Sequence, residues 1–432
     1  MRRALLTVLL VGAAASLSAC DRVPAGAVTE CNVSLAPTVQ TDVLFVIDDS
    51  DSMGEEQANL QANLGSFVSA LKSSPVAQDF HVGVTTTSVA NFTSTADLTG
   101  QAGALISNVP AGSPAVLDGA SPSFVSDFRA RVSVGTGGSG KEQPFRAMER
   151  ALSNPLLSGA NAGLLRPGAR LAVVFLSDED DCSDSFDPPR ITDPATGNKQ
   201  CHNDSGDGVD YKKDIIDPVS DYAAFLKGAV GGEVRDLVLA AIVGVDPDAK
   251  APTCGFAASD PNSWCCGSPQ DGVCAPGPAS RSVTVTGGLS GATWCVGGAG
   301  NTCVSQCATA FDKADRFTSL LSNFPAERTL TAAICDASFA DTLSQIGCML
   351  TPQDIPLQQT PADGRLLVVT LQSGAATIPC KLELAGSGRE ADPDVGVVYT
   401  APQGGQPAML HFQNACQLTC GQKIDINLVC AG

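Results

Sequence analysis

Two acidic clusters follow apolar runs in this sequence, and their residue types are those that bind divalent cations. The run VLFVI at 43–47 is followed at once by DDSDS at 48–52, and a second apolar run ends in LSDEDD at 176–181. Neighbouring carboxylates repel one another and are costly to bury unless a cation neutralises them. Carboxylate and hydroxyl oxygens suit a hard cation such as Mg²⁺. The two clusters therefore predict one divalent-cation site built from both.

The apolar runs also predict the elements that must position these clusters. The run at 43–47 and the first part of 169–185 show no alternation, which is typical of strands buried on both faces of a parallel sheet. Apolar residues at helical spacing predict a helix over 55–73. Strand and helix patterns alternate over most of 43–350, which predicts a doubly wound α/β fold with a mainly parallel sheet. Ligands bind such sheets at the carboxyl ends of the strands, where both clusters should lie.

The sequence resembles the von Willebrand factor type A family. DDSDS fits the D-x-S-x-S pattern of that family's metal-ion-dependent adhesion site, and like it follows an apolar strand and precedes a helix. The resemblance extends over about residues 40–350, interrupted by inserts. It implies the following metal ligands: Asp48, Ser50 and Ser52 from the first cluster, Asp178 from the second, and Ser139 from a glycine-rich loop where the family has Thr, with Thr136 as the alternative.

The resemblance also implies a function. In that family the cation, here Mg²⁺ (or Mn²⁺ or Ca²⁺), keeps one coordination position for a partner's carboxylate, so we expect binding of a protein or glycan ligand. The scattered His81, His202 and His411 form no catalytic arrangement with Ser or Cys, and we expect no enzyme. The alternative is a structural or assembly protein of the envelope, in which the metal site is vestigial and the disulfide-rich regions make the contacts.

The first twenty residues are typical of a bacterial lipoprotein signal. Arg2 and Arg3 precede an apolar stretch too short to span a bilayer comfortably, and LSAC at 17–20 resembles a lipobox. We expect a signal peptide over 1–19, lipid on Cys20 and a linker over 20–41. The protein would then be lipid-anchored in the bacterial envelope, at the outer membrane or cell surface rather than the inner membrane.

The charge balance limits the partners. Removal of the signal leaves 24 basic and 45 acidic residues, a net charge of −21. Such a surface repels the nucleic-acid backbone and anionic headgroups, so we expect no nucleic-acid partner and no membrane contact other than the lipid anchor.

The 17 Cys residues favour an oxidising compartment. Their irregular spacing argues against a zinc site. With Cys20 lipidated, sixteen remain for disulfides. The expected pairs are Cys182 with Cys201, Cys335 with Cys348, local bonds among Cys380, Cys416, Cys420 and Cys430, and Cys31 with one of the seven in the insert.

The chain divides into two expected units. The von Willebrand type A domain takes 42–350, with a Cys-rich insert at about 250–307, and a C-terminal all-β unit takes 360–432 because short strand-like runs separated by turns fill it. The later acids of 178–187 are expected to form a solvated loop, with a second, calcium-type site as the alternative.

Overall fold

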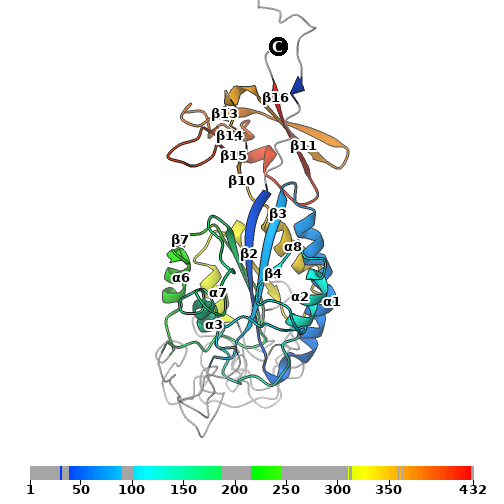
Figure 1. The fold of residues 1–432 in the computed structure, drawn as a ribbon, viewed down its shortest axis with the longest axis vertical. Coiled ribbons are helices and arrows are strands. Elements are labelled where there is room, and N and C mark those ends of the chain that lie inside the picture. The colour runs from blue at the N-terminus through cyan, green and yellow to red at the C-terminus, as the bar shows by residue number, and fades with distance from the viewer. Residues whose placement is uncertain are drawn as a thin grey trace, which may run out of the picture.

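The computed structural model describes residues 30–31, 38–89, 101–185, 216–245, 310, 314–358, 360–361 and 363–429. They form an α/β domain and a β unit that follow one another along the long axis of the molecule (Figure 1). The expected signal peptide, Cys20, most of the linker and the Cys-rich insert lie outside the described residues. None of the described helices is both long and apolar enough to cross a bilayer.

A six-stranded sheet forms the centre of the α/β domain, and it confirms the predicted mainly parallel sheet. Its order is β4–β3–β2–β5–β8–β9, and only the short β4 is antiparallel to its neighbour. The strands are β2 (Thr38–Ile47), β3 (Ala77–Thr86), β4 (Leu117–Asp118), β5 (Arg170–Leu176), β8 (Leu237–Val243) and β9 (Thr329–Ala333). The chain adds β3 on one side of β2 and the later parallel strands on the other, so the strand order reverses between β2 and β5.

Helices cover both faces of this sheet (Figure 1). One face carries α1 (Gly54–Lys72), α2 (Phe124–Val132) and α8 (Ala340–Met349), and the other carries α3 (Pro144–Ala151), α6 (Val219–Lys227) and α7 (Asp315–Leu321). Alternate residues of a strand point to opposite faces. Phe45 and Phe175 therefore lie in two separate cores, where their rings pack against Phe67 of α1 and Phe317 of α7 respectively. This double coverage explains why every residue of β5 is buried.

The C-terminal part forms two four-stranded sheets around one shared core. The first contains β1 (Glu30–Cys31), β16 (Lys423–Val429), β11 (Leu367–Ser373) and β12 (Ala376–Cys380), and the second β10 (Asp354–Pro356), β15 (Met409–Phe412), β14 (Val397–Thr400) and β13 (Leu382–Leu384). The β unit starts before the expected residue 360, because Ile355 of β10 is buried in its core. It also takes β1 from the chain that precedes the α/β domain.

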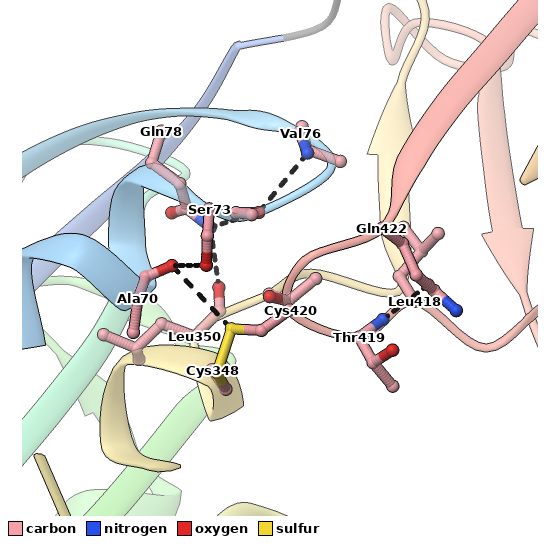
Figure 2. Close-up of a disulfide and its surroundings, with 12 residues drawn as sticks. Ala70, Ser73, Val76, Gln78, Cys348, Leu350, Leu418, Thr419, Cys420 and Gln422 are labelled. Carbon is pink, nitrogen blue, oxygen red and sulfur yellow. Dashed lines mark hydrogen bonds between the residues drawn. A yellow bond between two sulfur atoms is a disulfide. The ribbon is translucent and has the colours of Figure 1, made fainter. Parts of the chain in front are cut away.

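A disulfide joins the two units. Cys348 of α8 bonds to Cys420 of the β unit, with the Cα atoms 5.2 Å apart although 72 residues separate them (Figure 2). The expected pair of Cys335 with Cys348 is therefore wrong. Packing of the β unit against the end of α8 decides this bond, and the spacing of Cys residues in the sequence does not contain that information.

The other cysteines agree in part with expectation. Cys380 bonds to Cys416 inside the β unit, as expected for a local pair. Cys420 bonds outside that group, and Cys430 lies outside the described residues. Cys182 and Cys335 are disulfide-bonded. The expected partner of Cys182, Cys201, is also outside the described residues, so that pair stays a prediction.

Candidate metal centre

The carboxyl ends of β2, β3 and β5 bring three loops together at one edge of the sheet. The backbone N–H of Asp48 donates to the carbonyl of Leu176 over 2.9 Å, and that of Thr87 donates to the carbonyl of Ile47 over 3.1 Å. The two acidic clusters of the sequence are therefore neighbours. This edge lies at the opposite end of the α/β domain from the β unit (Figure 1).

Asp48 is fully buried and held by hydrogen bonds. Its Oδ1 accepts from the backbone N–H of Ser50 (2.9 Å) and from the Thr87 hydroxyl (3.4 Å), and its Oδ2 accepts from the Ser177 hydroxyl (2.6 Å). Burial, followed by the charge of Glu179, raises the pKa of Asp48 to about 7. Within the described part of the chain, no Lys or Arg forms an ion pair with it. Its orientation is fixed while its charge lacks a counterion.

Asp178 lies beside Asp48, and its carboxylate is less well hydrogen-bonded than that of Asp48. Its side chain is buried, and neither carboxylate oxygen has a hydrogen-bond partner of normal geometry among the described residues. Burial first, and then the charges of Asp48 and Glu179, raise the pKa of Asp178 well above its usual range, although the nearby Ser52 hydroxyl lowers it. Two buried carboxylates without a counterion are costly, and a bound cation would remove that cost.

The predicted ligands from the first acidic cluster and from the second thus lie together. The Ser50 and Ser52 hydroxyls are 3.2 Å apart, and Ser52 is close enough to Asp178 to affect its pKa. Two carboxylates and two hydroxyls form an all-oxygen donor set, which fits Mg²⁺ or another hard divalent cation. Metal binding by these residues stays a prediction.

The glycine-rich loop that precedes α3 reaches the same edge. The backbone N–H of Ser139 donates to the Ser88 hydroxyl (2.7 Å), which donates to Oδ1 of Asp49 (2.7 Å), and the Ser139 hydroxyl accepts from the backbone N–H of Lys141 (3.0 Å). These contacts place Ser139 beside Asp49. Thr136 instead lies next to Gly54, at the start of α1. The choice between Ser139 and Thr136 as the loop ligand stays open.

Gly138 allows this loop to pack against the first acidic cluster. Its N–H donates to the carbonyl of Asp49 over 2.7 Å, and a Cβ at this position would lie 2.3 Å from Cγ of Asp49. Gly138→Ala is therefore expected to cost about 2 kcal/mol of folding stability through overpacking. Gly137→Ala is the matched control, because its Cβ would meet nothing within 4 Å. Urea unfolding of both variants checks this, and equal midpoints would contradict it.

Asp180, Asp181 and Asp184 are buried, so the expectation of a solvated loop is wrong for them, and Asp187 lies outside the described residues. Asp184 is 2.6 Å from Nζ of Lys141, and Oδ2 of Asp181 accepts from Nε of Arg316 over 2.9 Å. Asp180 accepts from the backbone N–H of Arg316 at the start of α7 (3.0 Å), and Asp181 from that of Phe145 in the first turn of α3 (3.1 Å). Carboxylates stabilise helix amino termini because they accept from otherwise unpaired N–H groups. The partners of these acids are distant in sequence, so the acidic run alone did not reveal them.

Arg316 offers a test of this structural role. Arg316→Met would leave Asp181 buried next to an apolar side chain, and losing one partner of a buried pair is expected to cost about 3 kcal/mol. Arg146→Met is the control, because Arg146 pairs with Glu149 on the partly exposed side of α3, where an ion pair contributes at most about 0.5 kcal/mol. Thermal unfolding distinguishes them. A small effect of Arg316→Met would show that the ion pair of Arg316 with Asp181 contributes little to the stability of this loop.

The structure also brings together a group that the sequence analysis missed. Asp79, His81 and Asp118 place one potential ligand atom each within 4.8 Å of one another, since His81 and Asp118 are directly paired across β3 and β4. In the sequence, the sign of this group is the spacing of Asp79 and His81, which are two residues apart and therefore on the same face of β3. Arg166 forms an ion pair with Asp79 over 2.7 Å. This group therefore fits a cation less well than the Asp48 and Asp178 pair does.

Several solved structures are similar to this chain at low identity. A von Willebrand factor type A protein from Catenulispora acidiphila is 12% identical with a TM-score of 0.32, covering 91% of this chain and 59% of that one. The pilus adhesin SpaC from Lactobacillus rhamnosus GG, in an open conformation, is 11% identical with a TM-score of 0.35, covering 90% and 39%. Proximal thread matrix protein 1 from the mussel byssus is 10% identical with a TM-score of 0.33, covering 89% and 67%. The chain spans less than two thirds of the first two.

No protein-family model matches the chain, and no curated protein matches it.

Proposed function

We propose that this protein is an envelope lipoprotein that binds a protein or glycan partner through a divalent cation held by Asp48, Ser50, Ser52 and Asp178. The carboxylate of Asp178 carries the proposal. It is buried beside a second carboxylate and has no hydrogen-bond partner of normal geometry among the described residues. A fold that keeps such a group has left it available for a ligand from outside the chain.

The arrangement supports adhesive binding rather than catalysis. The carboxylates of Asp48 and Asp178 balance the charge of a divalent cation, so these two acids would not repel a partner's carboxylate strongly. The neutral hydroxyls of Ser50 and Ser52 add donor oxygens without adding charge. When bound, the cation would supply the positive charge that the partner's carboxylate contacts. The roles of Ser50 and Ser177 are to orient Asp48 through their hydrogen bonds to its carboxylate.

The topology supports the finer assignment of the fold. The order of strands reverses between β2 and β5, and both acidic loops follow these two strands. Ligands of doubly wound sheets bind at such a reversal point. This supports a doubly wound domain of the von Willebrand factor type A kind, as the D-x-S-x-S motif implies.

Calorimetric titration with Mg²⁺ and Mn²⁺ tests the metal site in the mature protein without its signal peptide. Wild type is expected to bind one cation, and Asp178→Asn none. A pull-down from envelope extract with Mg²⁺, and then with EDTA, tests the adhesive role. Cation binding without any chelation-sensitive partner would support the metal site and contradict adhesion.

The anchor has its own test. Cys20→Ser is expected to move the protein from the membrane fraction to the soluble fraction, because the lipid on this thiol is the proposed attachment. Partition of the variant with membranes, at the level of wild type, would place the anchor elsewhere.

A structural or assembly role is the second candidate, and the disulfide between the two units favours it. Cys348–Cys420 holds the β unit against α8 and gives the molecule a braced, two-part form. In this case partner capture would survive EDTA and the Asp178→Asn substitution.

A further inference from the structure

We infer that the β unit holds the metal edge away from the membrane, so that the site takes a carboxylate-bearing partner from outside the surface to which the protein is anchored. This inference rests on the proposed function, and in particular on lipid at Cys20. It adds the direction in which the site faces.

β1, the described segment that is nearest in sequence to Cys20, lies at the far end of the β unit. Gly421, just before β16, donates its N–H to the carbonyl of Ser73 in the α/β domain over 3.0 Å. At the other end of β16, Val429 pairs with Glu30 of β1. The seven residues of β16 therefore lead away from the junction over about 24 Å at the usual rise of a strand.

The metal edge lies at the far end of the other unit. Val39, near the start of β2, packs against the core of the β unit, and Asp48 directly follows the end of the same strand. Ten residues of β2 span about 33 Å. Figure 1 shows β16 and β2 following one another along the long axis. The metal edge and β1 are therefore about 55 Å apart.

The chain between the anchor and β1 is shorter than this separation. Ten residue steps lead from Cys20 to Glu30, and a chain of that length reaches at most about 35 Å. The β unit must therefore stay near the membrane. The net charge of −21 disfavours tipping of the protein onto an anionic membrane surface.

The junction between the units is braced, so the direction of the metal edge is fixed relative to the β unit. Figure 2 shows Cys348–Cys420 beside the end of α1, where Ser73 and Ala70 lie. Val76 contributes its side chain to the core of the β unit. Gln353 exchanges two hydrogen bonds with the backbone of Leu418, over 2.9 and 2.8 Å. A covalent bond, a buried side chain and paired hydrogen bonds together oppose bending at the connection.

Energy transfer to the membrane surface tests the inference. A donor dye is attached through an unnatural amino acid at Glu55 near the metal edge, or at Asn427 near β1, because the cysteines preclude thiol labelling. Both residues are exposed. The lipidated protein is reconstituted into vesicles of neutral and anionic phospholipid that carry an acceptor dye on the headgroups.

Transfer is expected to be several-fold more efficient from Asn427 than from Glu55. Equal transfer from the two positions, or stronger transfer from Glu55, would overturn the inference. The Cys20→Ser variant carries the same labels as the control and should show no transfer from either. If wild type also shows none from either position, the anchor itself is wrong, and this failure differs from equal transfer.

Discussion

Asp178→Asn is expected to abolish measurable Mg²⁺ binding and, without metal at pH 7, to stabilise the fold by about 2 kcal/mol. The gain arises because Asn has nearly the shape of the carboxyl group and no charge. No described hydrogen bond of normal geometry is lost, since neither oxygen of Asp178 accepts one. If Asp178→Asn stabilises the metal-free protein and also eliminates metal binding, the carboxylate serves the ligand and not the fold.

Asp178→Asn is also expected to change how the folding stability depends on pH. Burial raises the pKa of Asp178 well above its usual range and that of Asp48 to about 7. In the unfolded chain both carboxyls titrate near 4, so above pH 4 the unfolded state releases protons that the folded state keeps. The stability of the metal-free protein should therefore fall as the pH rises from about 4 to about 7. Asp178→Asn should reduce this fall and should change stability little at pH 4.

Thermal unfolding in EDTA at several pH values, repeated with Mg²⁺, measures both effects. The control is Asp51→Asn, because Asp51 lies in the same loop but is exposed. It should leave both the metal-free stability and its pH dependence nearly unchanged. Destabilisation by Asp178→Asn at pH 7 without metal would show that its carboxylate has a structural partner and is not held for a cation.

Asp48→Ala is the natural choice from the sequence alone, but it is a poorer test of metal ligation than Asp178→Asn. Repulsion between the neighbouring acids, taken alone, predicts that Asp48→Ala destabilises the fold little. Asp48 instead accepts hydrogen bonds from Ser50, Thr87 and Ser177, and its loss leaves the Ser50 N–H and the Thr87 hydroxyl without this acceptor in a buried place. That costs about 1–3 kcal/mol for each unsatisfied group. Loss of metal binding in this variant would not separate ligation from local disruption.

Removing the Cys348–Cys420 disulfide is expected to cost about 4 kcal/mol, because it closes a loop of 72 residues and restricts the unfolded chain. The double variant Cys348→Ala/Cys420→Ala avoids leaving a lone thiol. It should also loosen the junction, so that protease cleaves the connection around residues 350–353 faster than in wild type. Denaturant unfolding and limited proteolysis measure the two effects.

The pair Cys380–Cys416 provides the comparison. It closes a loop inside the β unit, so its removal should lower stability by a similar amount without exposing the connection between the units. If both double variants gave the same proteolytic pattern, Cys348–Cys420 would act as an ordinary stabilising crosslink and not as a brace between the units.

The central strands and the acids at their carboxyl ends follow from the amino-acid pattern alone. Apolar runs without alternation at 43–47 and 170–176 predict strands buried on both faces, since a parallel sheet covered by helices removes such runs from water. Acids directly after both strands then belong to one edge of the sheet. For this reason the sequence pattern predicts that Asp48, Ser50, Ser52 and Asp178 lie together.

Which acids gain a cationic partner, and which cysteines pair, depends on how distant segments pack in three dimensions. Asp181 and Asp184 look like Asp178 in the sequence, but Arg316 and Lys141 reach the former two and leave Asp178 without an ion pair among the described residues. Cys348 likewise bonds to Cys420 across the junction of the two units. These outcomes depend on the packing of segments that are far apart in the chain. The hydrophobic pattern of a segment predicts whether that segment is buried. It does not predict which side chains from other segments will contact it.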